Sequence, residues 1–202
     1  MAIYAEAQTS TSTPAPEGNH AARAVGMVDL GTQKNKFDPS KPDQRKVRIS
    51  FELPDELRED GKPFIVSQKF TLTLHEKGSL RKFLQSWRGK PFSEEEAKRF
   101  NISVLLGKPC LLNIIHETKE AGKTYANIAS VATLPKGMNA PAQITPTIEF
   151  SLSPGDYVQA EYDALPDFLR EEIALSPEYA AAQGPAAVLV PVSAEEEDGL
   201  PF

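Results

Sequence analysis

Several segments of the chain show a regular alternation of hydrophobic and polar residues. In residues 45–53, the hydrophobic residues Val47, Ile49, Phe51 and Leu53 occupy every second position, and polar or charged residues lie between them. Successive side chains of a strand point to opposite faces, so this period of two predicts a half-buried strand. Strand-like patterns predict four further strands, at residues 22–30, 64–74, 109–118 and 124–134.

Between the third and fourth predicted strands, the hydrophobic period changes to that of a helix. Hydrophobic residues recur there at intervals of three and four, at Leu80, Phe83, Leu84 and Trp87. This spacing puts them on one face of a helix. Ser79 is placed to cap the start of this helix and Gly89 to end it. Ser93 and Glu96 have the spacing of a capping box, which predicts a second short helix.

The predicted order of elements is three strands, then helices, then two strands. A five-stranded Greek-key barrel with a helix between its third and fourth strands is the OB-fold, which binds oligonucleotides and oligosaccharides. A ferredoxin-like or an SH3-like sheet matches this order less well. We therefore expect a mainly β protein, built as a five-stranded OB-fold barrel with helices between strands three and four.

Composition divides the chain into four parts. Residues 1–19 are rich in Ser, Thr, Pro and Ala and predict a disordered N-terminal arm. Residues 20–142 hold the predicted strands and form the expected barrel domain. Residues 143–194 form an extension in which a short helix is expected near residues 166–176, either docked on the barrel or free. Residues 195–202 form an acidic tail.

The net charge of −6 conceals an uneven distribution of charges along the chain. Residues 20–142 hold 21 lysines and arginines against 14 acidic residues, whereas residues 143–202 hold one arginine against 12 acidic residues. A basic body with an acidic tail is typical of a protein that binds a polyanion and carries an interaction tail.

The basic residues fall in the regions where an OB-fold binds its ligand. The ligand of this fold crosses the outer face of strands two and three and contacts the loops that join strands 1–2 and 4–5. A positive groove is what the binding of single-stranded DNA without sequence preference requires. The candidate cations are Lys34, Lys36, Arg45, Lys46, Arg48, Lys69, Lys119 and Lys123.

Aromatic side chains are the second requirement, because unpaired bases stack on them. Phe37 lies in a polar loop between lysines, and Tyr125 opens a strand beside a basic turn, so both are candidate stacking residues. Trp87 completes the hydrophobic face of the predicted helix, which favours a place in the core over a role in stacking. The remaining aromatic residues expected in the core are Phe51, Phe70, Phe83 and Phe100.

No motif in the chain supports a catalytic role. Residues 121–124 read Ala-Gly-Lys-Thr, but Glu117 stands where a phosphate-binding loop requires its first glycine. The three histidines have no metal-ligand spacing to the single cysteine, Cys110. We therefore expect a protein that is not an enzyme and that holds no metal and no cofactor.

The sequence also bears on the location of the protein. No run of 18 apolar residues predicts a helix that crosses a membrane. The first residues lack the basic start and the apolar block of a secretory signal. A single cysteine offers no disulfide framework. The expected location is the cytoplasm, with no membrane partner.

The last eight residues, EEEDGLPF, combine an acidic run with a hydrophobic end. They resemble the C-terminal tip of bacterial single-stranded DNA-binding proteins, which has aspartates, an apolar residue, proline and a terminal phenylalanine. Asp198 takes the acidic place, Leu200 the aliphatic one, and Pro201 and Phe202 match the last two. Glutamates replace most of the aspartates, and Gly199 stands where an acid often lies. The resemblance implies that Asp198, Leu200, Pro201 and Phe202 bind partner proteins.

Longer motifs within residues 22–180 resemble a group of bacteriophage-encoded single-stranded DNA-binding proteins, which are found near replication and recombination genes. The motifs are LHEKGSLRKFLQSWRGKPF, LLGKPCLLNIIHE, GKTYANIASVATLPKG and LPDFLREEIALSPEY. The resemblance implies a protein of the bacterial host cytoplasm that binds and protects single-stranded DNA during phage DNA replication or recombination. Its acidic tail would recruit replication or recombination proteins.

Two other functions remain open from the sequence. An OB-fold adaptor would bind a protein as its main ligand, and a strand-annealing recombination factor would accelerate the pairing of complementary strands. Binding to a short oligothymidine separates the first alternative, and a strand-pairing assay separates the second. The sequence is compatible with a homo-oligomer as well as with a monomer.

Overall fold

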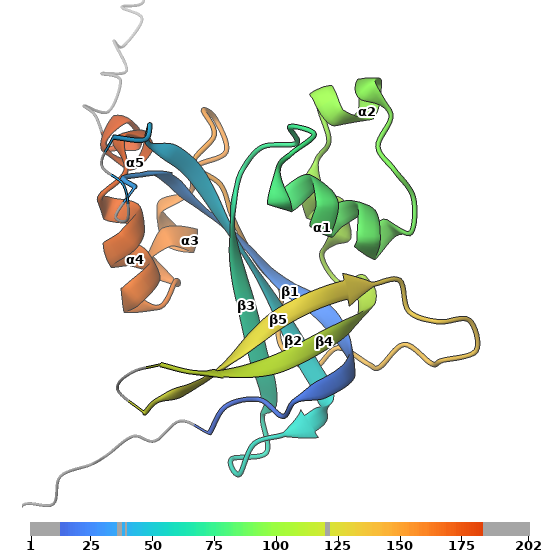
Figure 1. Ribbon diagram of the computed structural model, residues 1–202. Helices are drawn as coiled ribbons and strands as arrows, with labels where there is room; N and C mark the ends of the chain where they lie inside the picture. The colour runs from blue at the N-terminus through green and yellow to red at the C-terminus, as the bar shows by residue number, and fades with distance from the viewer. Residues whose placement is uncertain (1–12, 36–37, 39, 120–121, 184–202) are drawn as a thin grey trace, which may run out of the picture.

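The computed structural model describes residues 13–35, 38, 40–119 and 122–183. In this part of the chain six strands form one sheet, and short helices lie on both sides of it (Figure 1), so the predicted mainly β architecture is confirmed. The strands are β1 (Gly18–Gln33), β2 (Gln44–Leu57), β3 (Pro63–Thr71), β4 (Pro109–Thr118), β5 (Thr124–Ala132) and β6 (Ile148–Phe150). The helices are α1 (Ser79–Arg88), α2 (Glu94–Lys98), α3 (Gln159–Asp163), α4 (Asp167–Ala174) and α5 (Pro177–Ala182), with a 3₁₀ turn at Ile102–Leu105.

Five strands follow one another across the sheet in the order β3-β2-β1-β4-β5, and neighbouring strands are antiparallel. These are the five strands that the sequence predicts. The sixth strand, β6, has three residues, was not predicted and runs parallel to β1. Among the described residues β3 and β5 approach each other without forming a hydrogen-bonded ladder, so the sheet is open.

β1 is long enough to belong to both halves of the sheet. Its first part, Gly18–Arg23, pairs with β4, and its second part, Arg23–Gln33, pairs with β2. Irregularities in the β1–β2 register after Ala24 and after Asp29 mark β-bulges, which bend the strand. Residues 24–31 are all buried, because other parts of the chain cover this section of β1 on both faces.

The main core lies between the sheet and α1. The side chains of β2 that point inward are at most 2% exposed: Val47, Ile49, Phe51 and Leu53. The hydrophobic face of α1 meets them with the buried side chains Leu80, Leu84 and Trp87. Fully burying a side chain of this kind contributes about 1.5–3 kcal/mol, so the alternation in the sequence has a direct energetic cause.

Trp87 belongs to this core, as the helical period predicts. Its side chain is 3% exposed, and its Nε1 donates a hydrogen bond to the carbonyl oxygen of Pro109 at 3.0 Å. Its ring meets that of Phe51 edge-on, with 5.3 Å between the ring centroids. Trp87 is therefore not available to stack on a ligand. Phe70 is buried in the same core, and Phe83 and Phe100 pack against it.

The ends of the first two helices agree with the sequence except at one residue. Gly89 ends α1 in the left-handed conformation, with φ of 68°. Ser93 and Glu96 form the predicted capping box of α2. The prediction that Ser79 caps α1 is wrong. The N-cap is Gly78, and Ser79 is already the first helical residue, one position too late to cap.

A second hydrophobic core joins the C-terminal helices to β1. Val28 and Leu30 of β1 pack in this core rather than in the main one, together with Leu169 and Ile173 of α4. Ile173 is fully buried. The other buried members are Phe150, Leu152, Tyr162 and Leu165. The helix predicted near residues 166–176 is therefore α4, and it is docked on the sheet.

Polar contacts hold the same segment to the end of β1. The carboxylate of Glu178 in α5 accepts hydrogen bonds from the backbone N–H of Thr32, at 2.8 Å, and from the Thr32 hydroxyl. Gln33 Nε2 donates to the carbonyl oxygen of Glu172 at 3.0 Å. Each contact joins residues more than 130 positions apart, so the C-terminal helices are positioned by β1.

A buried carboxylate on β2 fixes the connection that follows β5. Glu52 is fully buried, and its two oxygens accept hydrogen bonds from the backbone N–H groups of Ile144 and Thr145, at 2.9 and 2.7 Å. A buried charged group is tolerated when hydrogen bonds replace its hydration. Glu52 therefore anchors residues 144–145 over the sheet.

Candidate nucleic-acid interface

The turn between β4 and β5 presents two lysines around a partly exposed tyrosine. The Nζ atoms of Lys119 and Lys123 lie 5.0 and 5.6 Å from the centroid of the Tyr125 ring, within cation–π distance. Tyr125 is 39% exposed. Gly122 has φ of 73° and donates its backbone N–H to the carbonyl oxygen of Lys119 at 2.8 Å, which tightens the turn. The structure thus brings together three residues that the sequence assigns to DNA binding.

Two other predicted cations, both on β2, are engaged within the fold. The Nε of Arg45 lies 3.1 and 3.2 Å from the carboxylate oxygens of Asp29, and Nη2 contacts the same group. The hydrogen bond that Arg45 donates to Asp29 raises the pKa of Arg45 above its ordinary value. Lys46 Nζ donates to Gln44 Oε1 and Thr71 Oγ1, both at 2.8 Å. Burial lowers the pKa of Lys46.

Arg48 and Lys69 face each other across β2 and β3, and both contact α4. The Cζ atom of Arg48 lies 5.3 Å from the centroid of the Phe168 ring. Lys69 Nζ lies 2.7 and 2.6 Å from the two carboxylate oxygens of Glu172. Burial lowers the pKa of Arg48, and the nearby charge of Glu172 acts in the opposite direction.

The chain from residue 141 to residue 182 therefore lies over the outer face of β1 and β2. Arg23 Nε donates to the carbonyl oxygen of Pro141 at one end of this cover, and Glu178 binds Thr32 at the other. In Figure 1, α3, α4 and α5 lie on the opposite side of the long strands from α1 and α2. The face on which the sequence places a ligand is thus shared with the protein's own C-terminal segment.

Of the remaining predicted site residues, the structure describes one. Lys34 is exposed in the loop after β1, whereas Lys36 and Phe37 of the same loop lie outside the described residues. The predicted partner-binding residues also lie outside them: Asp198, Leu200, Pro201 and Phe202. The assignment of these residues to DNA or to partner proteins stays a prediction.

Two residues of α4 contact the predicted cations and were missed from the sequence. Phe168 and Glu172 lie four positions apart, on one face of the helix. The buried face is set by Leu169 and Ile173, which have the same spacing but begin one position later. Phe168 therefore lies beside the hydrophobic face of the helix and not within it. From this position its exposure could have been inferred from the sequence.

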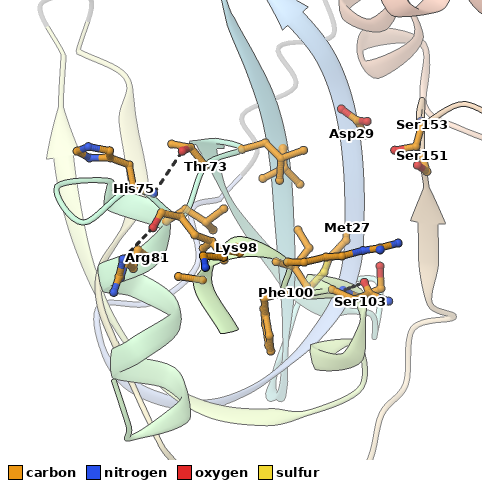
Figure 2. A pocket seen from close by; sticks show the side chains of 18 of the residues that line it. Met27, Asp29, Thr73, His75, Arg81, Lys98, Phe100, Ser103, Ser151 and Ser153 are labelled. Carbon is orange, nitrogen blue, oxygen red and sulfur yellow. Dashed lines mark hydrogen bonds between the residues drawn. The ribbon is translucent and has the colours of Figure 1, made fainter. Parts of the chain in front are cut away.

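A cleft of about 970 Å³ lies between the β3–α1 connection, α2, the 3₁₀ turn and residues 149–156 (Figure 2). Its charged side chains are of both signs: Asp29, Glu76, Arg81, Glu94, Lys98, Arg99, Glu149 and Asp156. Arg81 is also held by the carbonyl oxygen of Leu74, at 3.2 Å. Because the acids would repel a polyanion, this cleft suits single-stranded DNA less well than the β4–β5 turn.

No model of a protein family matches the chain, and no curated protein is significantly similar to it. Within the described residues, no helix has the length and apolar character needed to cross a membrane. In the same part of the chain, no three histidine, cysteine or acidic side chains are grouped to hold a metal ion. Burial raises the pKa of the Cys110 thiol, which disfavours the reactive thiolate.

Proposed function

We propose that this chain is an OB-fold protein that binds single-stranded DNA without strong sequence preference. The strand order β3-β2-β1-β4-β5, with α1 and α2 between β3 and β4, supports the fold assignment, because it is the order of a Greek-key barrel opened between β3 and β5. The approach of β3 to β5 supports it further, since such a barrel closes between these strands.

The β4–β5 turn is the observation that carries the DNA-binding proposal. In an OB-fold this turn borders the ligand groove. Here it combines the partly exposed ring of Tyr125 with the ammonium groups of Lys119 and Lys123. A base stacks on the ring while the lysines neutralise neighbouring phosphates. Duplex bases are already stacked on each other, so this combination favours an unpaired strand.

The sequence supports a role in DNA replication or recombination. The motifs within residues 22–180 resemble those of phage-encoded single-stranded DNA-binding proteins, and residues 195–202 resemble the partner-binding tip of the bacterial proteins. The proposal therefore includes recruitment of replication or recombination proteins through residues 195–202.

Anisotropy titrations with a labelled oligothymidine of about 16 nucleotides, the upper site size of one OB-fold, test DNA binding. Affinity should fall with salt, with a slope of log K against log salt of about −0.7 per phosphate neutralised. Replacing Lys119 and Lys123 with alanine should flatten the slope by up to about 1.4, since two phosphate contacts are lost. Tyr125→Ala should lower the affinity roughly 5- to 150-fold and leave the slope nearly unchanged, because stacking releases few counterions.

The matched control replaces Lys82 and Lys90, two exposed lysines on and after α1, with alanine. This helix lies at the other end of β5 from the turn, where Thr133 donates a hydrogen bond to the carbonyl oxygen of Trp87 (Figure 1). The control removes the same charge and should change the slope much less. A salt-independent affinity, equal binding to duplex of the same length, or equal effects of the two lysine pairs would contradict the proposal.

A further inference from the structure

Two cations on neighbouring strands both contact a helix that is distant from them in the sequence. Arg48 of β2 and Lys69 of β3 lie directly opposite each other in the register. Like charges at such positions repel and destabilise a sheet. Here α4 compensates the repulsion, since it places the ring of Phe168 beside Arg48 and the carboxylate of Glu172 on Lys69.

The two side chains from α4 bring an aromatic ring and an anionic group to the two cations. Phe168 and Glu172 lie four residues apart, so they project from the same face of the helix. Phe168 supplies a planar ring that contacts the guanidinium of Arg48 and keeps an exposed side, on which a base would stack. Glu172 supplies two anionic oxygens, both within 2.7 Å of an ammonium group, which is where a phosphate would bind.

This contact is accessible to a ligand. The Lys69 side chain is 45% exposed, and Phe168 is 53% exposed. The Glu172 side chain is 23% exposed, so water reaches this ion pair mainly from the Lys69 side and screens it. A phosphate with neighbours on the same strand can therefore take the place of the Glu172 carboxylate on Lys69.

The helix itself need not leave the sheet for this exchange. Leu169 and Ile173, on the neighbouring face of α4, are 5% and 0% exposed in the second core. Removing them from that core would expose hydrophobic surface to water. Rotation of the Glu172 side chain, which is only partly buried, exposes no such surface.

We propose that Arg48, Lys69 and Phe168 form a subsite for one nucleotide of a bound DNA single strand, and that Glu172 occupies its phosphate position in the free protein. This inference rests on the proposed function. It assigns α4 a part in DNA binding, with Phe168 as a stacking residue on its exposed side and Glu172 as a competitor of the phosphate.

The test compares Glu172→Gln with Glu171→Gln in the full chain, with the same labelled oligothymidine at low salt. Glu171 is exposed on the same helix and contacts no cation in the described part of the chain. Both variants remove one negative charge, but only Glu172→Gln removes the competitor. Glu172→Gln should bind about 1.4- to fivefold more tightly than Glu171→Gln, the range that follows from exposed ion pairs.

The same substitution in a Lys69→Gln variant checks that the gain in DNA affinity acts through Lys69. In Lys69→Gln the gain from Glu172→Gln should disappear, because no ammonium group remains to be released. Phe168→Ala should weaken binding roughly 5- to 150-fold through lost stacking, and the ring is exposed enough for the variant to fold. Equal affinities of the two glutamine variants, or a gain that persists without Lys69, would overturn the subsite alone. Absence of oligothymidine binding by the wild-type chain would overturn the proposed function and the subsite together.

Discussion

Replacing Gly31 with alanine tests whether the C-terminal helices are a fixed part of the fold. Gly31 lies near the end of β1 with φ of +68°, and an added Cβ would lie 2.4 Å from both the Cβ and the Oγ of Ser176. Ser176 is 2% exposed and caps α5, where its Oγ accepts a hydrogen bond from the backbone N–H of Tyr179 at 3.2 Å. The new methyl group must therefore displace either the α4–α5 junction or β1.

Two separate costs set the size of the effect. A residue with a Cβ in the left-handed conformation loses about 1–2 kcal/mol, and forcing an extra methyl group into a packed contact adds about 1–3 kcal/mol. Gly61 offers a matched control, because it has φ of +75° and nothing within 4 Å of an added Cβ. Gly61→Ala therefore carries only the first cost. A chain of this length shifts its Tm by about 2–4 °C per kcal/mol, so Gly31→Ala should melt about 2–12 °C below Gly61→Ala.

Thermal unfolding followed by far-UV circular dichroism measures this difference, and limited proteolysis shows whether cleavage within residues 141–182 becomes faster. Ser176→Gly in the Gly31→Ala background removes both clashing atoms and costs only a few tenths of a kcal/mol as an N-cap change. The double variant should recover most of the lost stability. Equal melting temperatures for the two glycine variants, or no recovery in the double variant, would show that α5 does not pack against β1 in solution.

Two further changes examine the same docked segment. Ile173→Ala should lower the free energy of unfolding by about 2–5 kcal/mol in denaturant titrations, because the side chain is fully buried in the second core. Leu175→Ala, at a residue 72% exposed in the same segment, should change it by no more than about 0.5 kcal/mol, and similar effects of the two would contradict the docking. Burial tends to raise the pKa of Glu178, but hydrogen bonds from Thr32 outweigh it and hold this pKa below the ordinary value of 4.5. The stability from Glu178 is therefore complete above about pH 4.5 and is lost as the pH falls through the lower folded-state pKa. Glu178→Gln should lose less stability than the wild-type chain across that acid range, and parallel acid titrations would contradict the contact.

The strands of the main core could be predicted because each is buried on one face. Val47, Ile49, Phe51 and Leu53 alternate with polar residues, and this pattern appears in the structure as buried and less buried positions up to Phe51. Glu52 departs from it, because residues 144–145 cover this polar position. The helical face of α1 follows from the same principle with a different period. These elements can therefore be predicted from local patterns, without knowing which distant segments pack against them.

Apart from the helix near residues 166–176, the C-terminal cover of the sheet could not be predicted in this way. Residues 24–31 of β1 are buried on both faces, so they show a nearly continuous hydrophobic run instead of an alternation. Neither β6, with three residues, nor α3, with five, is long enough to establish a period. The pairing of Lys69 with Glu172 joins residues 103 positions apart, and many other acids in the sequence could equally have been its partner.

The cover also changes how the uneven charge of the chain is understood. Residues 143–183 contain eight acidic residues, which could neutralise the basic body and leave no charge for a ligand. Among the described residues, however, Glu172 alone of these acids forms an ion pair with a cation of the body, and Asp167 pairs with Arg170 of its own helix. None of the ion pairs found in the described part of the chain joins these acids to Lys119 or Lys123, whose ammonium groups lie beside Tyr125. The extension covers part of the predicted DNA-binding face. We therefore expect binding to centre on the β4–β5 turn and to reach β2 and β3 only where the contact of Glu172 with Lys69 is broken.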